Sequence, residues 1–516
     1  MKTQISAQNK RIAKNTAYLF VQKLIIILLA LYTARILLKT LGIDDYGLYG
    51  LVGSIVVMFN SLRTMFSNSI QRFINVAKGE GDSQRIRSIY STGVIIHLGM
   101  AVIFVSAVEI AAWFFLPDLN IVPERYNAAF WVLQCSVLSA VISLMTVPYD
   151  ALLIANERFM AISVLSVTEY TLRLGVVFLL YITPGDRVVV YAILLVIVSI
   201  IVRIANAVYC HHSLGEEARF QRGVNKPLLK EMTGFAGWNF IGNLGYSLSN
   251  EGVNIVLNIF GGIVVNAART ITYQVSAALT QFVSYAVVSF QPRSITIYCS
   301  GDFDGFMTLQ SIGAKVNVGI FSIIAAPLIA FTPAILNFWL GEIPPYTVAF
   351  IQTLLLYQAI RCLHSPVDTL FKAAGNLRNY QLCELFFMML NLPLSWVALK
   401  AGAPYWVAFI IMAILETANL VSIMILANKM LHFPIRTFAT NVVLRSVVIF
   451  GLLGSICYLA HTFELSQMPF PILLASSAGL ALLMSLSVLL ILFSNAERQR
   501  LFSLLPLERF KKQSHR

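Results

Sequence analysis

The stretch WNFIGNLGYSLSNEGVNIVLNIF, residues 238–260, decides how this chain folds. It is long and apolar enough to cross a bilayer, since a spanning helix needs roughly 20 mostly apolar residues, yet it contains five asparagines and one glutamate. On a helix, which advances about 100° per residue, the asparagines and Ser247 share one arc with Glu251 beside it: Asn239, Asn243, Asn250, Asn254 and Asn258. The pattern predicts a membrane helix with one polar face.

The whole chain has the composition of a membrane protein. Of its 516 residues, 58% are hydrophobic and only 12% are charged, with a mean hydropathy of +0.76, whereas soluble domains are about 25% charged. Unbroken apolar runs, rather than the alternation of barrel strands, predict an all-α, polytopic integral membrane protein with about 14 transmembrane helices. We place them at 15–38, 47–68, 88–115, 127–149, 159–182, 188–210, 234–260, 268–291, 315–340, 346–367, 379–400, 404–431, 441–461 and 470–494.

The basic residues predict the orientation of these spans. With a cytoplasmic N-terminus, 26 of the 37 Lys and Arg residues fall in cytoplasmic segments and only five in outer loops. This bias follows the positive-inside rule and predicts a multi-pass protein with both termini in the cytoplasm. Most of the +13 net charge lies in these segments and in the tail LERFKKQSHR, residues 507–516. These would face anionic lipid headgroups, so we expect membrane lipids as partners and no nucleic acid.

The segments between spans exclude several classes of protein. None is long enough for a catalytic or nucleotide-binding domain, and the chain has neither a G-x-x-x-x-G-K-[ST] phosphate loop nor an H-E-x-x-H metal motif. The cysteines stand singly, and the Cys-His-His run at 210–212 lacks further ligands. We therefore predict no enzyme activity, no catalytic residues, no metal site and no resident cofactor.

A weak internal repeat divides the chain. A shift of 219 residues places LLKTLG, ending at Gly42, over VLNIFG, ending at Gly261. The resulting prediction is an N-terminal lobe of six spans at 1–225, a C-terminal lobe of six spans at 226–433, and two additional spans with a basic cytoplasmic tail at 434–516. Transporters built from two parallel repeats bind substrate between the lobes near the middle of the membrane.

Charged residues inside spans are expensive and usually face an interior or a cavity. Glu169 and Arg173 are four residues apart on one helical face, which favours an internal ion pair over a ligand site. Arg203, Asp368 and Glu384 lie near predicted cytoplasmic ends and Arg35 near an outer end, where long side chains reach the interface. The basic candidates for a cavity between the lobes are Lys23, Arg35, Arg63, Arg269 and Arg361.

These residues suit an anionic substrate that carries hydroxyl groups. Arginine binds phosphate through paired hydrogen bonds, and asparagine offers a donor and an acceptor to sugars. The cavity candidates are therefore the five asparagines of the polar face, Glu251 and the basic side chains. The alternative for each single asparagine is a hydrogen bond to a neighbouring helix. Pro327 and Pro333, within one predicted span, could supply bends for movement or serve packing alone.

Two segments resemble a known family. NEGVNIVLNIFGGIVVNAARTITYQV (250–275) and TARILLKTLGIDDYGLYGLVGSIVVMF (33–59) are similar to the Wzx-like polysaccharide and O-antigen flippases. These belong to the multidrug/oligosaccharidyl-lipid/polysaccharide exporter superfamily, and the similarity extends over essentially the whole chain. The resemblance implies alternating access through a cationic central cavity, with Lys23, Arg35, Arg63 and Arg269 at the positions where cavity cations are expected.

The function implied by this resemblance is translocation of oligosaccharide linked through pyrophosphate to undecaprenol. It implies the bacterial inner membrane, surface polysaccharide biosynthesis such as that of lipopolysaccharide, and polymerase and glycosyltransferase partners. Coupling to H⁺ or Na⁺ needs a titratable group, for which Glu251 and Glu416 are the candidates. The alternative is a cation-coupled drug or metabolite antiporter of the same superfamily, whose cationic substrates would favour an acidic cavity.

Overall fold

The computed structural model describes the backbone of residues 2–57, 70–71, 73–74, 77–78, 81–156, 158–221, 223, 225–374, 377–462 and 468–504. Within these ranges it does not describe the side chains of residues 2–20, 55–57, 115, 234–244, 246–248, 284–293, 295–296, 299, 365, 372, 377 and 500–504. Arg63 lies outside the described residues. Asn239 and Asn243 lie in a helix, but their side chains are among those not described.

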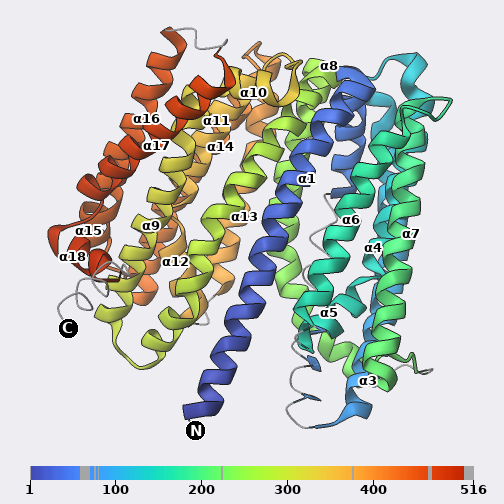
Figure 1. Ribbon diagram of the computed structural model, residues 1–516, viewed down its shortest axis with the longest axis horizontal. Coiled ribbons are helices and arrows are strands. Elements are labelled where there is room, and N and C mark those ends of the chain that lie inside the picture. The colour runs from blue at the N-terminus through green and yellow to red at the C-terminus, as the bar shows by residue number, and fades with distance from the viewer. Residues whose placement is uncertain are drawn as a thin grey trace. The chain divides into compact units, whose positions relative to one another are not determined.

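The described residues form α-helices joined by short turns, without a β-strand, and the all-α prediction is confirmed (Figure 1). Within the described part, eleven helical segments are long and apolar enough to cross a membrane. The α-helices of the first half are α1 Lys2–Val57, α3 Ser83–Phe115, α4 Tyr126–Leu144, α5 Val147–Ala155, α6 Phe159–Leu179, α7 Arg187–Leu214 and α8 Lys226–Cys299. Those of the second half are α9 Phe303–Ala330, α10 Thr332–Leu340, α11 Thr347–Arg361, α12 Ser365–Ala374, α13 Leu377–Lys400, α14 Val407–Leu431, α15 Ile435–Phe438, α16 Leu444–Thr462, α17 Phe470–Ile491 and α18 Asn495–Leu504.

The two longest helices are each two helices joined at a glycine. In α1 the backbone leaves the helical conformation at Gly42 (φ 80°, ψ 173°), and in α8 it does so at Gly262 (φ 71°, ψ −172°). A positive φ with this ψ is accessible to glycine but strained for other residues. The two glycines are 220 residues apart and have nearly the same dihedral angles. At these turns Gly42 therefore corresponds to Gly262, one residue beyond the Gly261 that a shift of 219 placed opposite it.

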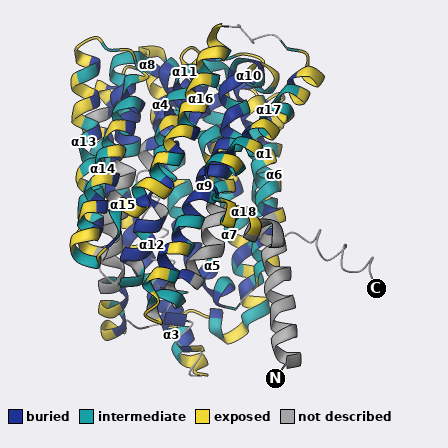
Figure 2. Cartoon of the chain, turned by 90° about the vertical axis from the view of Figure 1, so that its left-hand side faces the viewer, coloured by how far each residue is buried: buried dark blue, intermediate teal, exposed yellow. Residues whose placement is uncertain are grey.

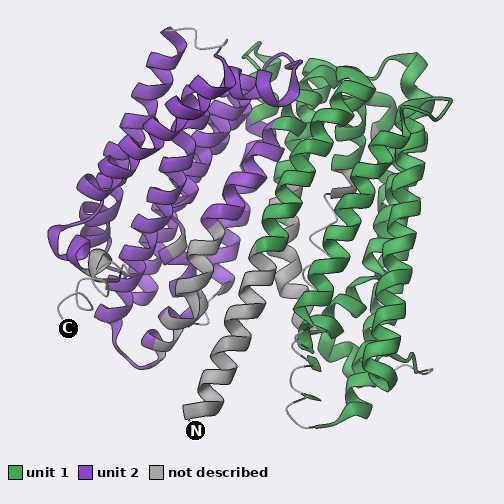
Figure 3. Cartoon of the chain, viewed as in Figure 1, with its two compact units in different colours: residues 1–271, 395–405 green, residues 272–394, 406–516 purple. Residues whose placement is uncertain are grey.

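The chain groups into two compact units (Figure 3). Unit 1 comprises residues 1–271 and 395–405, and unit 2 comprises residues 272–394 and 406–516. The predicted boundary lay at residue 225, whereas residues 226–271 group with unit 1. Two contacts with earlier parts of the chain explain this grouping. Gly47 packs against the carbonyl of Ile263, and Asn258 Oδ1 accepts a hydrogen bond from the Asn120 amide at 2.9 Å.

Each unit buries an apolar interior and exposes apolar side chains. In unit 1 the interior includes Leu48, Leu51, Val132 and Leu152. Large side chains such as Trp113 are nonetheless exposed, and Figure 2 shows exposed residues along the lengths of the helices. A soluble protein seldom exposes so much apolar surface. Helices satisfy their own backbone groups in hydrocarbon, so these faces suit contact with lipid.

The predicted ninth span, 315–340, is broken in unit 2. Helix α9 ends at Ala330 and α10 begins at Thr332, with Pro333 in the first turn of α10 and Pro327 inside α9. A proline lacks the amide hydrogen of an interior helical residue but is well tolerated at a helix start. Pro333 therefore favours a new helix at this point rather than a continuation of α9.

Helix α18 is attached to α9 by a buried charge pair within unit 2. Lys315 Nζ, on α9, lies 2.8 Å from both carboxylate oxygens of Glu497, and its side chain is 3% exposed. The Glu497 carboxylate also accepts a hydrogen bond from the Ser494 amide at 2.7 Å, which caps the first turn of α18. Burial raises the pKa of Glu497, but the hydrogen bonds from Lys315 and Ser494 outweigh burial and hold that pKa below its usual value.

Candidate functional site

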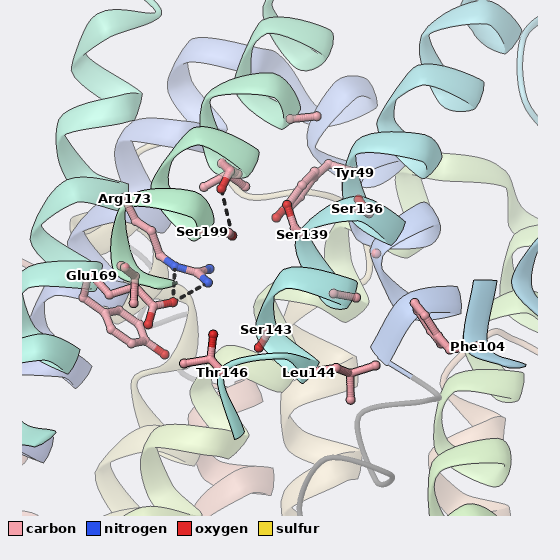
Figure 4. Close-up of a pocket in the computed structure, with 16 residues that line it drawn as sticks. Tyr49, Phe104, Ser136, Ser139, Ser143, Leu144, Thr146, Glu169, Arg173 and Ser199 are labelled. Carbon is pink, nitrogen blue, oxygen red and sulfur yellow. Dashed lines mark hydrogen bonds and ion pairs between the residues drawn. The ribbon is translucent and has the colours of Figure 1, made fainter. Parts of the chain in front are cut away.

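A polar cavity of about 520 Å³ lies inside unit 1 (Figure 4). This volume is within the range of small-molecule sites, about 300–1,000 Å³. Helices α1, α3, α4, α6 and α7 contribute its walls. The lining residues are Tyr49, Gly53, Phe104, Ser136, Ser139, Ala140, Ser143, Leu144, Thr146, Glu169, Tyr170, Arg173, Ala192, Leu195, Ser199 and Val202.

Hydroxyl groups from α4 line one wall. Ser136, Ser139 and Ser143 recur at intervals of three and four, followed by Thr146 just after the helix, which places them on one helical face. Thr146 Oγ1 donates to the Ile142 carbonyl at 2.9 Å. That bond uses the hydroxyl hydrogen and leaves oxygen lone pairs as acceptors. The spacing is visible in the sequence, but the site prediction rested on asparagine and charged residues and missed the serines.

An ion pair on α6 supplies the charges of the cavity. Arg173 donates to Glu169 Oε1 from Nε at 3.1 Å and from Nη2 at 2.7 Å, so the internal pair predicted from their spacing is confirmed. The side chains keep exposures of 40% for Arg173 and 31% for Glu169. Figure 4 shows the pair beside the cavity. Because both bonds from Arg173 end on a single carboxylate oxygen, its Nη1 atom is not used in this pair and can meet a ligand.

The predicted asparagine face is partly occupied by hydrogen bonds that close the α8 hairpin. Asn266 Nδ2 donates to the carbonyl and the side-chain oxygen of Asn254, at 2.9 and 2.7 Å. Asn258 Nδ2 donates to Asn266 Oδ1 at 2.9 Å. All three side chains are buried. In this structure Asn254 and Asn258 thus make the interhelical bonds that were the alternative to a cavity role, and any contact they make with substrate stays a prediction.

Arg269 and Glu251 lie in the same hairpin. Arg269 Nη1 is 3.4 Å from Glu251 Oε2, and its Nη2 donates to the Asn250 carbonyl. Both charged side chains are buried. The sequence candidates Asn250, Glu251 and Arg269 are therefore brought together, with the two charges compensating one another.

The remaining candidates are separate from this group. Lys23 is half-buried on α1 and Arg35 is exposed on the same helix. Glu416, on α14 in unit 2, lies among Arg361, His364 and Glu384. Within the described residues, no group of three or more His, Cys, Asp or Glu side chains has the arrangement of a metal site.

Similar folds occur among solved transporter structures. "Lipid II flippase MurJ, inward closed conformation" is 13% identical, with a TM-score of 0.67 over 91% of this chain and 97% of that one. An inward-facing multidrug resistance MATE family transporter of the MOP superfamily is also 13% identical, with a TM-score of 0.67 over 78% and 94% of the two chains. A MOP superfamily transporter from Pyrococcus furiosus, at 12% identity, gives 0.54 over 80% and 92%. These likenesses show the fold.

Among proteins of curated function, none matches the sequence. A family model described as "Polysaccharide biosynthesis protein" matches residues 12–297, which is more than half of the 516 residues. The resemblance inferred from the sequence is confirmed at the level of family and fold. This multi-pass helical chain belongs to the polysaccharide biosynthesis protein family.

Proposed function

We propose that this protein moves lipid-linked oligosaccharide units from one leaflet of a membrane to the other during surface polysaccharide biosynthesis. The observation that carries the proposal is the hydroxyl-lined cavity with an arginine inside the membrane-spanning helices of a polysaccharide biosynthesis protein. Its fold is shared with transporters, among them a protein named as a lipid II flippase.

The chemistry of the cavity suits a sugar. Exposing a hydroxyl to hydrocarbon without a partner costs several kcal/mol, and an oligosaccharide has many hydroxyls, so it needs a polar path. Ser136, Ser139, Ser143, Thr146 and Ser199 offer such a path along the cavity wall. The lipid chain of the substrate can stay in the bilayer, because only the polar headgroup needs the protein interior.

The anionic part of the substrate needs a cation. Arg173 is partly exposed at the cavity, and a guanidinium matches phosphate oxygens through paired hydrogen bonds. In our proposal the substrate is an undecaprenyl-pyrophosphate-linked unit, and Lys23, Arg35, Arg63 and Arg269 are further candidate cations on its route.

The proposal extends to the setting of the reaction. We place the protein in a bacterial inner membrane with both termini in the cytoplasm, beside the polymerase and glycosyltransferases that use and supply its substrate. An H⁺ or Na⁺ gradient drives alternating access in this proposal, with Glu251 and Glu416 as the coupling candidates from the sequence.

A drug or metabolite antiporter is the second candidate, because a multidrug MATE transporter shares the fold. A surplus of carboxylates in the cavity would favour a cationic drug. The described cavity lining has no such surplus, because the charge of Glu169 is balanced by that of Arg173. The family match to polysaccharide biosynthesis also favours the glycan.

The test is the leaflet location of lipid-linked oligosaccharide in cells with and without the protein, measured by protection from a membrane-impermeant glycan-labelling reagent. We expect the glycan to accumulate on the cytoplasmic side without the protein. Wild type and the exposed-site control Lys39→Gln should restore labelling, whereas Arg173→Gln should restore it much more slowly. An unchanged distribution in the deletion strain would refute the flippase and favour the antiporter.

A further inference from the structure

Unit 2 contains a partly buried cluster of four ionisable side chains from separate parts of the chain. Arg361 ends α11, His364 lies in the turn before α12, Glu384 is on α13 and Glu416 is on α14. Arg361 Nη1 lies 2.7 Å from Glu384 Oε1 and 2.8 Å from Glu416 Oε1. His364 Nε2 lies 2.9 Å from the same Glu416 oxygen. Figure 1 shows helices α11, α13 and α14, which carry three of these residues.

Most of the cluster is shielded from water. The Glu416 and His364 side chains are each 4% exposed and Glu384 is 16% exposed, whereas Arg361 keeps an exposure of 33%. A buried charge is costly unless it is paired, and breaking a buried pair leaves the other charge uncompensated. The protonation states of these side chains must therefore balance.

With both carboxylates ionised, the charges balance only if the histidine is protonated. Two carboxylates face one arginine, so a neutral His364 leaves the cluster with an excess negative charge, and an imidazolium cancels it. Among the described side chains around the cluster, the neighbours named here add no cation: Tyr357 and Tyr380 carry phenol groups, Cys362 and Cys383 carry thiols, and Asp368 on α12 adds a further acid. On the adjacent helix α9, Lys315 is paired with Glu497.

Histidine is the side chain suited to exchange this proton. Its ordinary pKa, about 6.5, lies within the physiological range, so that small changes of environment add or remove the charge. Arginine keeps its proton throughout this range. Within the described residues both ring nitrogens of His364 are buried and neither makes a hydrogen bond of good geometry, although Nε2 lies 2.9 Å from Glu416 Oε1. Both nitrogens are therefore available to carry a proton in this conformation.

We infer that Arg361, His364, Glu384 and Glu416 form a proton-binding site that couples transport to a proton gradient. This inference rests on the proposed function and names both the coupling ion and its acceptor. His364 takes up one proton to become an imidazolium, and the neutral cluster then holds α11, α13 and α14 together. Loss of the proton to the other side of the membrane leaves the carboxylates in excess and favours separation of these helices and entry of water.

A proton fits this site better than a sodium ion. Hard metal cations bind several oxygen ligands, and the Glu416 oxygen at the centre already contacts a guanidinium and an imidazole. The fixed positive charge of Arg361 repels a metal ion at this position. A proton instead binds nitrogen on the imidazole ring.

The first experiment measures protonation directly and does not depend on transport. Protein labelled with ¹⁵N-histidine is placed in lipid nanodiscs, and the ring resonances are followed by NMR from about pH 5 to 8. The His364 resonance is identified by its loss in His364→Gln, with His461→Gln, an exposed site on α16, as the matched control. We expect His364 to convert between its neutral and charged forms in this range. Glu416→Gln should weaken the binding of this proton, because a nearby opposite charge favours the charged form of the imidazole.

The second experiment measures glycan labelling at the outer surface with and without a protonophore. We expect the protonophore to stop labelling in wild type and in His461→Gln, and His364→Gln to lose that response. A His364 that stays neutral over the whole range, or a His364→Gln variant that responds to the protonophore like wild type, would overturn the inference. If wild type moved no glycan but His364 still titrated, the proposed function would fail while the proton site remained supported.

Discussion

The contact between the two glycine-turn hairpins depends on the absence of a side chain at Gly47. This residue follows the Gly42 turn on α1, and a Cβ built on it would press on the Ile263 carbonyl group of α8. The carbonyl carbon would be 2.9 Å away and the Ala267 amide nitrogen 3.2 Å away. These are backbone atoms that cannot rotate aside, so in Gly47→Ala the hairpins must move apart.

The expected change in the free energy of unfolding of Gly47→Ala follows from two effects. Overpacking of a well-packed contact costs about 1–3 kcal/mol, whereas alanine gains about 1 kcal/mol over glycine in a helix interior. The matched control is Gly99→Ala on α3, where a Cβ would meet no atom within 4 Å. Both variants receive the same helical gain. Their free energies of unfolding should therefore differ by about 1–3 kcal/mol, with Gly47→Ala less stable than the control.

The assay is equilibrium unfolding of the purified proteins in mixed micelles with increasing SDS, followed by far-ultraviolet circular dichroism. Equal stability of Gly47→Ala and Gly99→Ala would show that the two hairpins do not approach as closely as described. A Gly50→Ala variant gives a second comparison, because its Cβ would meet the Thr270 side chain. A side chain can rotate, so a smaller loss is expected there than at Gly47.

Three further predictions concern polar groups inside the two units. Asn266→Ala removes three hydrogen bonds made with Asn254 and Asn258 and should lower the free energy of unfolding by about 2–4 kcal/mol; an unchanged SDS midpoint would contradict this. Glu497→Gln should destabilise the protein by leaving Lys315 buried without its partner. The pKa of Glu497 is lower in the folded protein than its ordinary value. The wild-type pair therefore contributes its full stability above the ordinary pKa of glutamate, and this stability is lost as the pH falls through the lower pKa of the folded state. The melting temperature of wild type should therefore fall on acidification more than that of Glu497→Gln. If the melting temperatures of the two proteins changed with pH in parallel, the pair would not stabilise the protein as described. Arg173→Gln should slow glycan labelling about 10–150-fold, the loss of roughly 1.5–3 kcal/mol for a charged hydrogen bond. Labelling at the wild-type rate would show that Arg173 is not on the substrate path.

Most of the helices were predictable because hydrophobic runs of span length have few other structures available to them. The predicted spans 159–182 and 470–494 correspond to α6 and α17 within a few residues. The break between α9 and α10 was harder to place. Pro333 marked a bend there, but a proline by itself does not say whether a helix kinks or restarts.

The sequence showed that polar residues within the spans were unusual, but it did not show which groups they bind. The helical arc placed Asn254 and Asn258 on one face and could not show that Asn266, across the Gly262 turn, would bond to both. His364 was not identified, because a single histidine in a turn has no spacing signal. Glu384 and Arg203 were interpreted as groups reaching the membrane surface. Glu384 instead binds Arg361, and Arg203 lies over the Tyr149 ring, 4.2 Å from its centre.

The sequence by itself determined the membrane class and the helical fold, because these depend on composition, periodicity and length, which are local properties of the chain. The family was inferred from the resemblance of the segments 250–275 and 33–59 to known flippases. Only the tertiary structure decided which side chains meet. The cluster of Arg361, His364, Glu384 and Glu416 joins residues up to 55 positions apart, and the cavity joins α1 to α7. Such contacts are set by how helices pack against one another. A charge inside a membrane has several possible partners, and the sequence of its own helix does not specify which one it will bind.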